Sequence, residues 1–377
     1  MFSDLAVWLR IVLAAALSFA VSYLMVPQVK KFAESVHAVD EPSARRINDH
    51  PVPRMGGIAI FCGFMAAALL FAELSRQVKG ILIGCMMIAV MGGLDDIFNL
   101  NAWVKLACQI AAAIVAVSCG VLADTFTNFM MEEGLIYPSD LVSAVITVIW
   151  IVGCTNAINL IDGLDGLSCG ITMIVLCVIG FISYQMRRID VTIVALILFG
   201  SIGGVLPFNF NPASIFVGDC GALFMGFMIS CLSLLGFKSS TFVSLIFPLI
   251  ILFVPLADTS LAIIRRKLKG QKISEADRSH LHHVLMYKVG LSHKNTVLLL
   301  YLVTLLFGGD AILMFFNEKI GTLVLFVLCL IAWIFIEKTG MIKPGFQPVL
   351  GLSRKITGHS KKAIATKVDN DPKEQKD

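Results

Sequence analysis

The sequence predicts an all-α, polytopic integral membrane protein, and three observations support this prediction. Of the 377 residues, 57% are apolar and only 15% are charged, whereas soluble domains are about 45–50% apolar and about 25% charged. The mean hydropathy is +0.86. Apolar runs approaching the roughly 20 residues that a helical membrane span needs recur along the chain. The composition excludes a disordered chain or a secreted scaffold, and the net charge of +4 gives no reason to expect a nucleic-acid partner.

Eleven membrane-spanning helices are predicted. The first apolar run lacks a basic segment before it and continues into Val26–Lys31, so an uncleaved helix is preferred to a signal peptide. The ten cysteines include no C-x-x-C pair and lie mostly inside apolar runs, where they act as small hydrophobic residues. The predicted spans are 5–27, 57–74, 80–94, 103–122, 141–156, 167–184, 191–207, 221–237, 241–264, 296–316 and 320–337.

The basic residues predict the orientation of the chain. Loop 28–56 holds five Lys or Arg residues and loop 265–295 holds eight, whereas segment 123–140 on the other side holds none. Because basic loops stay in the cytoplasm, the N-terminus is expected outside and the C-terminus inside. Residues 1–340 then form the transmembrane domain, and 341–377 form a polar, Lys-rich cytoplasmic tail.

The most unusual polar segment, TNAINLIDGLDGLSCG at Thr155–Gly170, follows directly on an apolar run. Ionisable residues at the edge of a membrane segment are expensive, so a chain that keeps two carboxylates there uses them. Hydrogen bonding between helices, the structural alternative, explains the amides better than the carboxylates. Four polar residues recur at a three-residue step: Asn156, Asn159, Asp162 and Asp165.

A second acidic cluster ends the third predicted span, in the sequence GGLDDIFNLNAWVK. Asp95 and Asp96 are adjacent, so on a helix they point about 100° apart and are expected to serve different tasks. Lys105 follows ten residues after Asp95. The alternative, helix capping at the membrane edge, rarely needs two carboxylates.

The loop PFNFNPASIFVGDCG, 207–221, holds the third carboxylate. Asp219 stands between glycines just before a new span, and Asn209 and Asn211 can donate to a phosphate or carbonyl oxygen of a substrate. A turn aspartate that caps the next helix is the alternative interpretation.

The basic loop 265–295 contains DRSHLHHVLM, with Arg278, His280, His282 and His283. No cysteine and no H-E-x-x-H pattern accompany the histidines, which favours anion binding over zinc. The basic run at 265–269 also fits a lipid-facing patch beside the membrane.

Together these loops predict several acids and cations on one cytoplasmic face. That mixture suits a divalent metal that holds phosphates, Mg²⁺ with Mn²⁺ as an alternative. The chain has no Walker or Rossmann glycine motif, which argues against ATP hydrolysis and dinucleotide redox chemistry. Transfer of a phosphate-bearing group to a lipid fits such a site. An ion-coupled transporter, the non-enzyme alternative, predicts acids near mid-span and an internal repeat; neither is present in the sequence.

Four motifs in order resemble the polyprenyl-phosphate N-acetylhexosamine-1-phosphate transferases of glycosyltransferase family 4. They are GGLDD with Lys105 downstream, NAINLIDGLDGL, NFNPASIFVGDCG and the HLHH loop. The stretches PVPRMGG and DRSHLHH are similar to the branch that uses UDP-GlcNAc. The branch that transfers phospho-MurNAc-pentapeptide is expected to carry a TPTMGG-type stretch and three consecutive histidines, and it remains the alternative.

The resemblance implies transfer of GlcNAc-1-phosphate from UDP-GlcNAc to undecaprenyl phosphate, the first membrane step of a cell-envelope polysaccharide. It implies a multi-pass protein of the bacterial cell membrane with a cytoplasmic site, and it suggests a homodimer. Asp219 is implied as the principal magnesium ligand with Asp96 second, and Asp95 is placed beside the lipid phosphate as a base or an orienting group. The implied substrate-binding residues are Lys105, Asn156, Asn159, Asp162, Asp165, Asn209, Arg278, His280, His282 and His283.

Overall fold

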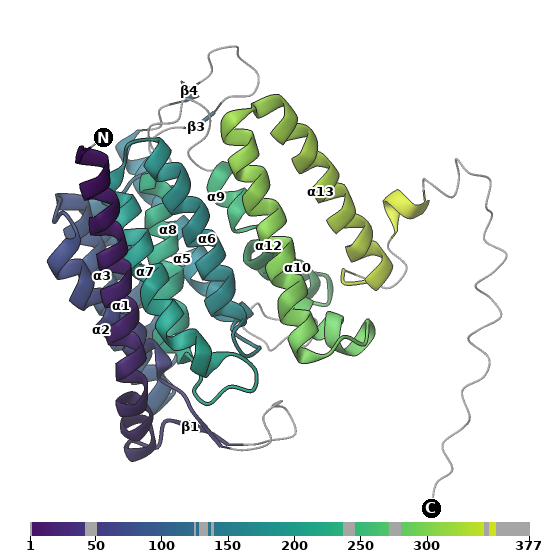
Figure 1. Cartoon of the computed structure of the whole chain (residues 1–377). Coiled ribbons are helices and arrows are strands. Elements are labelled where there is room, and N and C mark those ends of the chain that lie inside the picture. Colours follow the sequence, from purple (N-terminus) through teal and green to yellow (C-terminus); the bar gives the residue numbers. More distant parts are fainter. Residues whose placement is uncertain are drawn as a thin grey trace, which may run out of the picture.

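The structure, a computed structural model, is a bundle of long helices (Figure 1). It describes residues 2–41, 51–123, 126–127, 135–136, 139–236, 246–270, 280–342 and 347–351. The N-terminus lies at one end of the bundle, where β3 (Phe126–Thr127) and β4 (Leu135–Ile136) also lie. β1 (Val39–Asp40) lies at the opposite end and pairs antiparallel with β2 (Val52–Pro53).

The helices follow the chain in the order that the apolar runs predict. A short π-helical turn, Val284–Lys288, joins α11 to the segment before α12. The helices are α1 (Phe2–Ser35), α2 (Gly56–Phe71), α3 (Arg76–Phe98), α4 (Ala102–Ser118), α5 (Asp140–Ile161), α6 (Leu167–Gln185), α7 (Ile189–Asn209), α8 (Gly218–Gly236), α9 (Ile246–Ile251), α10 (Phe253–Leu268), α11 (Leu281–His283), α12 (His293–Phe316) and α13 (Glu318–Thr339).

The predicted membrane architecture is confirmed in outline. Within the described residues, eight helices are long and apolar enough to cross a membrane, and α2 and α4 are shorter apolar helices. These ten coincide with ten of the predicted spans. The ninth predicted span, 241–264, differs: its described part is divided into α9 and α10. Pro255 lacks the N–H that would bind the carbonyl of Ile251, so one continuous helix loses a hydrogen bond there.

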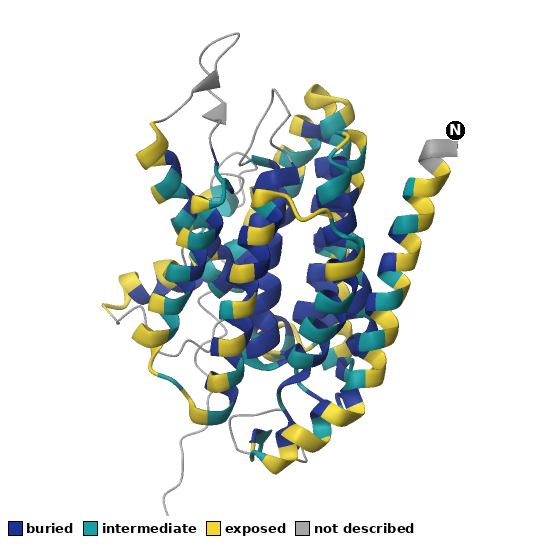
Figure 2. Cartoon of the chain, turned by 90° about the vertical axis from the view of Figure 1, so that its left-hand side faces the viewer, coloured by how far each residue is buried: buried dark blue, intermediate teal, exposed yellow. Residues whose placement is uncertain are grey.

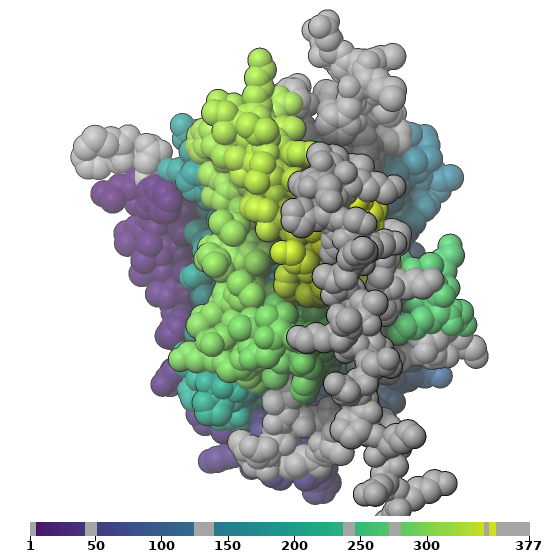
Figure 3. All heavy atoms as spheres, turned by 90° about the vertical axis from the view of Figure 1, so that its right-hand side faces the viewer, coloured from purple at the N-terminus to yellow at the C-terminus, as the bar shows by residue number. Residues whose placement is uncertain are grey.

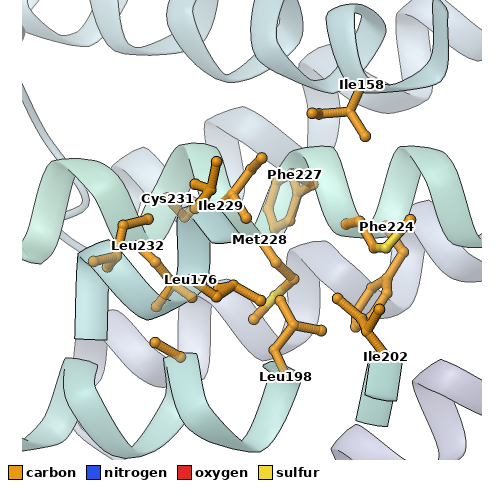
Figure 4. Packing of buried hydrophobic residues seen from close by; sticks show 14 of the residues in the cluster. Ile158, Leu176, Leu198, Ile202, Phe224, Phe227, Met228, Ile229, Cys231 and Leu232 are labelled. Carbon is orange, nitrogen blue, oxygen red and sulfur yellow. The ribbon is translucent and has the colours of Figure 1, made fainter. Parts of the chain in front are cut away.

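Helix α8 forms the centre of the core. Every residue from Cys220 to Gly236 is buried, and Figure 4 shows Phe224, Phe227 and Met228 among side chains of the neighbouring helices. Figure 2 shows buried residues concentrated in the central helices and exposed residues on the outward sides. Helices α12 and α13 form an outer layer on one face (Figure 3). Many exposed residues of the outer helices are apolar, which suits contact with lipid.

Small residues let two helices touch the start of α8. A Cβ atom at Gly57 of α2 would lie 2.3 Å from the Cα of Gly221, and one at Gly92 of α3 would lie 2.5 Å from the Cα of Cys220. Neither position has room for a side chain, because real Cβ atoms do not approach so closely. The first turn of α8, which carries Asp219, is therefore fixed from two sides by main chain.

Candidate active site

A cavity of about 510 Å³ opens at the end of the bundle opposite the N-terminus. Its walls come from the β1–β2 region, the end of α3, the α5–α6 turn, the α7–α8 loop, α11 and the start of α12. The sequence places these segments up to 253 residues apart, from position 40 to position 293. Its polar lining residues are Asp40, Arg54, Asp96, Asn159, Asp162, Asp165, Asn209, Asn211, Asp219, His282, His283 and His293.

Lys105 joins two of the predicted acids beside this cavity. Its Nζ lies 2.9 Å from Asp95 Oδ2 and 3.0 Å from Asp219 Oδ2. Asp95 Oδ1 also accepts a hydrogen bond from the main-chain N–H of Leu100, at 2.6 Å. The lysine and Asp219 are partly exposed, whereas the Asp95 side chain is 8% exposed. The structure thus brings together three residues that the sequence assigned to one site.

Asp96 does not contact Lys105; its carboxylate binds the start of α8. Its Oδ1 accepts from the main-chain N–H of Asp219 at 2.9 Å, and its Oδ2 accepts from that of Cys220 at 3.1 Å. Gly218, with φ +70°, leaves room for the carboxylate, since a Cβ there would lie 2.5 Å from Asp96 Oδ2. Both carboxylate oxygens are therefore engaged with the helix N-terminus, an arrangement that stabilises a negative charge.

The α5–α6 turn supplies Asn159 and Asp162 to the cavity. Ser168 donates its hydroxyl to Asp162 Oδ1 at 2.5 Å. Burial raises the pKa of Asp162 to about 7, and the nearby negative charges of Asp219 and Asp165 act in the same direction. The Asn159 side chain has no hydrogen-bond partner within the described residues, so it is available to a ligand.

Asp165 and Asn209 connect that turn to the α7–α8 loop. Asp165 Oδ2 accepts from Asn211 Nδ2 at 2.9 Å and from the main-chain N–H of Ala213 at 3.0 Å. Asn209 accepts from the N–H of Gly166 at 3.2 Å and donates to the carbonyl of Ile215 at 3.0 Å. Both side chains line the cavity while holding its two polar loops together.

The histidines divide into two groups. His282 and His283 line the cavity, and burial lowers the pKa of His282 to about 3, so its imidazole is neutral. His280 is not part of the lining; its Nδ1 lies 2.9 Å from Asp258 Oδ2 in a buried pair. Arg278 lies outside the described residues, so its substrate role stays a prediction.

Asn156 also lies away from the cavity lining. Its Nδ2 donates to Gln109 Oε1 at 2.6 Å and to the carbonyl of Val152 at 2.8 Å. The bond to Gln109 joins α5 to α4. Hydrogen bonding between helices was the alternative that the sequence offered for the asparagines, and Asn156 shows it. This geometry gives no support for a substrate contact of Asn156.

Three polar residues of the lining were not predicted as site residues, namely Asp40, Arg54 and His293, and Asn211 was predicted only as a possible hydrogen-bond donor. Arg54 donates to the carbonyl of Asp96 at 2.8 Å and lies 3.3 Å from Asp40 Oδ1. The stretch PVPRMGG that contains Arg54 is bound to the α7–α8 loop, because Gly56 and Gly57 donate to the carbonyls of Phe216 and Val217, at 2.8 and 2.9 Å. Asn211 stands in a recognised motif, whereas no local pattern marked His293.

The carboxylates of the cavity are compatible with magnesium held partly by substrate phosphates. No group of three His, Cys, Asp or Glu side chains suited to hold a metal ion occurs in the part of the chain that the structure describes. Magnesium is commonly held by one or two carboxylates together with substrate phosphates and water. Asp219 and Asp162, both in the cavity lining, supply such carboxylates.

Comparisons with known proteins agree with the four motifs. The family model described as glycosyl transferase family 4 matches residues 78–237. The chain is 41% identical to a probable undecaprenyl-phosphate N-acetylglucosaminyl 1-phosphate transferase of Bacillus subtilis (strain 168), covering 90% of this chain and 95% of that protein.

Two further relatives are more distant. A decaprenyl-phosphate N-acetylglucosaminephosphotransferase of Mycobacterium leprae (strain TN) is 32% identical over 79% of this chain and 82% of its own length. A phospho-N-acetylmuramoyl-pentapeptide-transferase of Staphylococcus aureus (strain JH9) is 26% identical over 78% of this chain and 95% of its own length. The resemblance inferred from the motifs is confirmed, and the chain belongs to glycosyl transferase family 4.

Proposed function

We propose that this protein transfers GlcNAc-1-phosphate from UDP-GlcNAc to undecaprenyl phosphate and releases UMP. The observation that carries the proposal is the placement of Lys105 between Asp95 and Asp219, beside a cavity lined by carboxylates, amides and imidazoles. The likeness to the Bacillus subtilis transferase, at 41% identity over most of both chains, supports the same substrates.

In the proposed reaction an oxygen of the lipid phosphate attacks the β-phosphorus of UDP-GlcNAc. The bond from that phosphorus to the bridging oxygen breaks, and the electron pair leaves with UMP. A phosphate monoester has a second pKa near 6, so at neutral pH it is mostly dianionic and needs no base. The task of the protein is to align two anions that repel each other, and Lys105 supplies a positive charge at this point.

The contacts of the acids indicate the role that each plays in this reaction. We assign the principal magnesium contact to Asp219, and we assign a supporting contact to Asp162, which also lines the cavity. Bound Mg²⁺, or Mn²⁺ in its place, would neutralise negative charge on the diphosphate. Asp96 was predicted as the second ligand, but its oxygens accept two main-chain hydrogen bonds, which favours a capping role. Asp95 orients Lys105 rather than acting as a base.

The proposed membrane topology has eleven spans, an outside N-terminus and an inside C-terminus. It places the cavity on the cytoplasmic face of the bacterial cell membrane. Two observations support this: the basic loops 28–56 and 265–295, and the location of the cavity at the end of the bundle opposite the N-terminus. The homodimer that the resemblance suggests stays a prediction, and so does the Lys-rich tail, of which residues 352–377 lie outside the described part.

Two alternatives make different predictions. A phospho-MurNAc-pentapeptide transferase accepts UDP-MurNAc-pentapeptide, but this chain carries PVPRMGG and His-Leu-His-His at the distinguishing positions. An ion-coupled transporter yields no lipid-linked product. Its acids are expected near mid-span, whereas the acids of this cavity gather at one end of the bundle.

A radiolabel assay distinguishes the three functions. The purified protein in detergent is given undecaprenyl phosphate, Mg²⁺ and either UDP-GlcNAc or UDP-MurNAc-pentapeptide. A lipid-linked product from UDP-GlcNAc alone, with release of UMP, is the expected result. A product from the pentapeptide substrate alone would favour the other branch, and no product from either would favour the transporter.

A further inference from the structure

We propose that His293 is a positioning residue for the transfer reaction: its Nε2 atom fixes the turn that carries Asp162 and Asp165. The inference rests on the proposed function for its effect on catalysis, but its structural part is independent of the substrate. No sequence motif marked His293, which begins α12 more than 120 residues after that turn.

The first step is the contact itself. The main-chain N–H of Asp165 donates to His293 Nε2 at 3.0 Å. A ring nitrogen accepts a hydrogen bond only when it carries no proton, so Nε2 is unprotonated. The other ring nitrogen, Nδ1, lies 3.4 Å from Nδ2 of Asn211. The ring is held at the start of α12, where the Ser292 side chain caps the helix by accepting from the N–H of Asn295.

The same helix holds the neighbouring residue of the turn. The hydroxyl of Tyr301, two turns further along α12, donates to the carbonyl of Gly166. The ring of Tyr301 fills the space beside Gly170, where a Cβ would lie 2.0 Å from its Cζ. Residues 162–166 lie between α5 and α6, so these two helices satisfy only part of their main-chain groups. Helix α12 provides two further partners.

The α5–α6 turn also positions the opposite wall of the cavity. Asp165 accepts from Asn211 and from the N–H of Ala213, and the N–H of Gly166 donates to Asn209. These partners belong to the segment that leads to Asp219. A displacement of Asp165 therefore moves Asp162 on one wall and the approach to Asp219 on the other. Small misplacements of this kind can lower a rate by about 100-fold.

Two substitutions separate the roles of the two ring nitrogens. In His293→Gln the side-chain amide reaches about as far as Nε2, so its oxygen can accept from the N–H of Asp165. In His293→Asn the amide ends near the position of Nδ1 and cannot reach. We expect kcat/KM for UDP-GlcNAc to stay within about 3-fold of the wild type for Gln, and to fall about 10–100-fold for Asn and for His293→Ala.

Hydrogen exchange provides a readout that needs no substrate. The amide of Asp165 should be protected in the wild type and in His293→Gln, and should exchange faster in His293→Asn. Tyr301→Phe, which removes the bond to Gly166, should lower kcat/KM in the same direction. Tyr184→Phe is its matched control, because Tyr184 packs on Trp8 near the other end of α6, with ring centroids 4.7 Å apart.

The proposal is overturned if His293→Asn keeps activity while His293→Gln loses it, since the Nδ1 side would then be the functional one. It is also overturned if the exchange of the Asp165 amide is unchanged in His293→Asn. Absence of wild-type activity with UDP-GlcNAc would refute the proposed function alone, because the exchange result would still test the role of His293.

Discussion

Asp96 accepts hydrogen bonds from the main-chain N–H groups of both Asp219 and Cys220, at 2.9 and 3.1 Å. One carboxylate of the adjacent acidic pair therefore caps the helix that presents Asp219. Its neighbour, Asp95, binds Lys105 instead. One acid thus holds the cation that contacts Asp219, and the other caps the helix whose first turn carries Asp219, so the pair performs two separate tasks.

Replacing Asp96 with Asn should destabilise the protein. The amide nitrogen of the new side chain would face a main-chain N–H that now donates to a carboxylate oxygen, and the helix loses a charge at its N-terminus. We expect a loss of about 1–2 kcal/mol in unfolding free energy, together with lower transferase activity. Chemical unfolding in detergent measures the first effect. Asp190→Asn, which affects the ion pair with Arg188, is a matched control expected to change stability by less than about 1 kcal/mol.

Asp95→Asn should lose less activity than Asp219→Asn at pH 8. At that pH the lipid phosphate is dianionic and needs no base. The amide oxygen introduced by Asp95→Asn can still accept from the N–H of Leu100, whereas Asp219→Asn removes the proposed metal contact. Initial rates of lipid-linked product formation give the comparison. Equal and total loss in both variants would contradict the ranking and return Asp95 to the role of base.

Gly57→Ala should destabilise the contact between α2 and α8. The added methyl would lie 2.3 Å from the Cα of Gly221, so the helices must separate. Overpacking of this kind costs about 1–3 kcal/mol. Gly153→Ala is the matched control, because nothing lies within 4 Å of its Cβ position in α5; it should be neutral or stabilising by up to about 1 kcal/mol. Unfolding curves of both variants that overlay would exclude close helix packing at Gly57.

The neutral state of His282 predicts a stability that depends on pH. Burial lowers its pKa from 6.5 to about 3, so the unfolded chain binds a proton at this residue more readily than the folded protein. The contribution of the neutral ring is complete above pH 6.5 and is lost as the pH falls from 6.5 towards 3.

Midpoints of thermal unfolding at about pH 7.5 and about pH 5, on either side of the unfolded-state pKa, test this. His282→Gln should reduce the difference between the two pH values, although it lowers stability at both. The exposed His37, changed to Asn because its φ is +58°, serves as the control and should leave the difference unchanged. If the unfolding midpoint changed equally between the two pH values in wild type and His282→Gln, the His282 ring would not be buried in its neutral form.

The sequence by itself determined the helices and most of the acids of the site. Apolar runs of span length are local, and α6, α12 and α13 begin and end within a few residues of the predicted limits. The sequence also predicted that Asp95, Lys105 and Asp219 belong to one site. The alternation of basic and poorly basic loops placed their segments on the same membrane face. The family was also recognisable from the sequence, because its motifs are short and continuous.

Only the tertiary structure decided what each polar group binds. The capping of α8 by Asp96 joins residues 123 positions apart, and the bond from Asp165 to His293 spans 128. Asn156 and Asn159 share one motif, yet one binds Gln109 and the other lines the cavity, because Asn159 lies nearer the end of α5, where the cavity is. Residue type and spacing predict which groups can act as donors and acceptors; their partners depend on how distant helices pack, which no local pattern records.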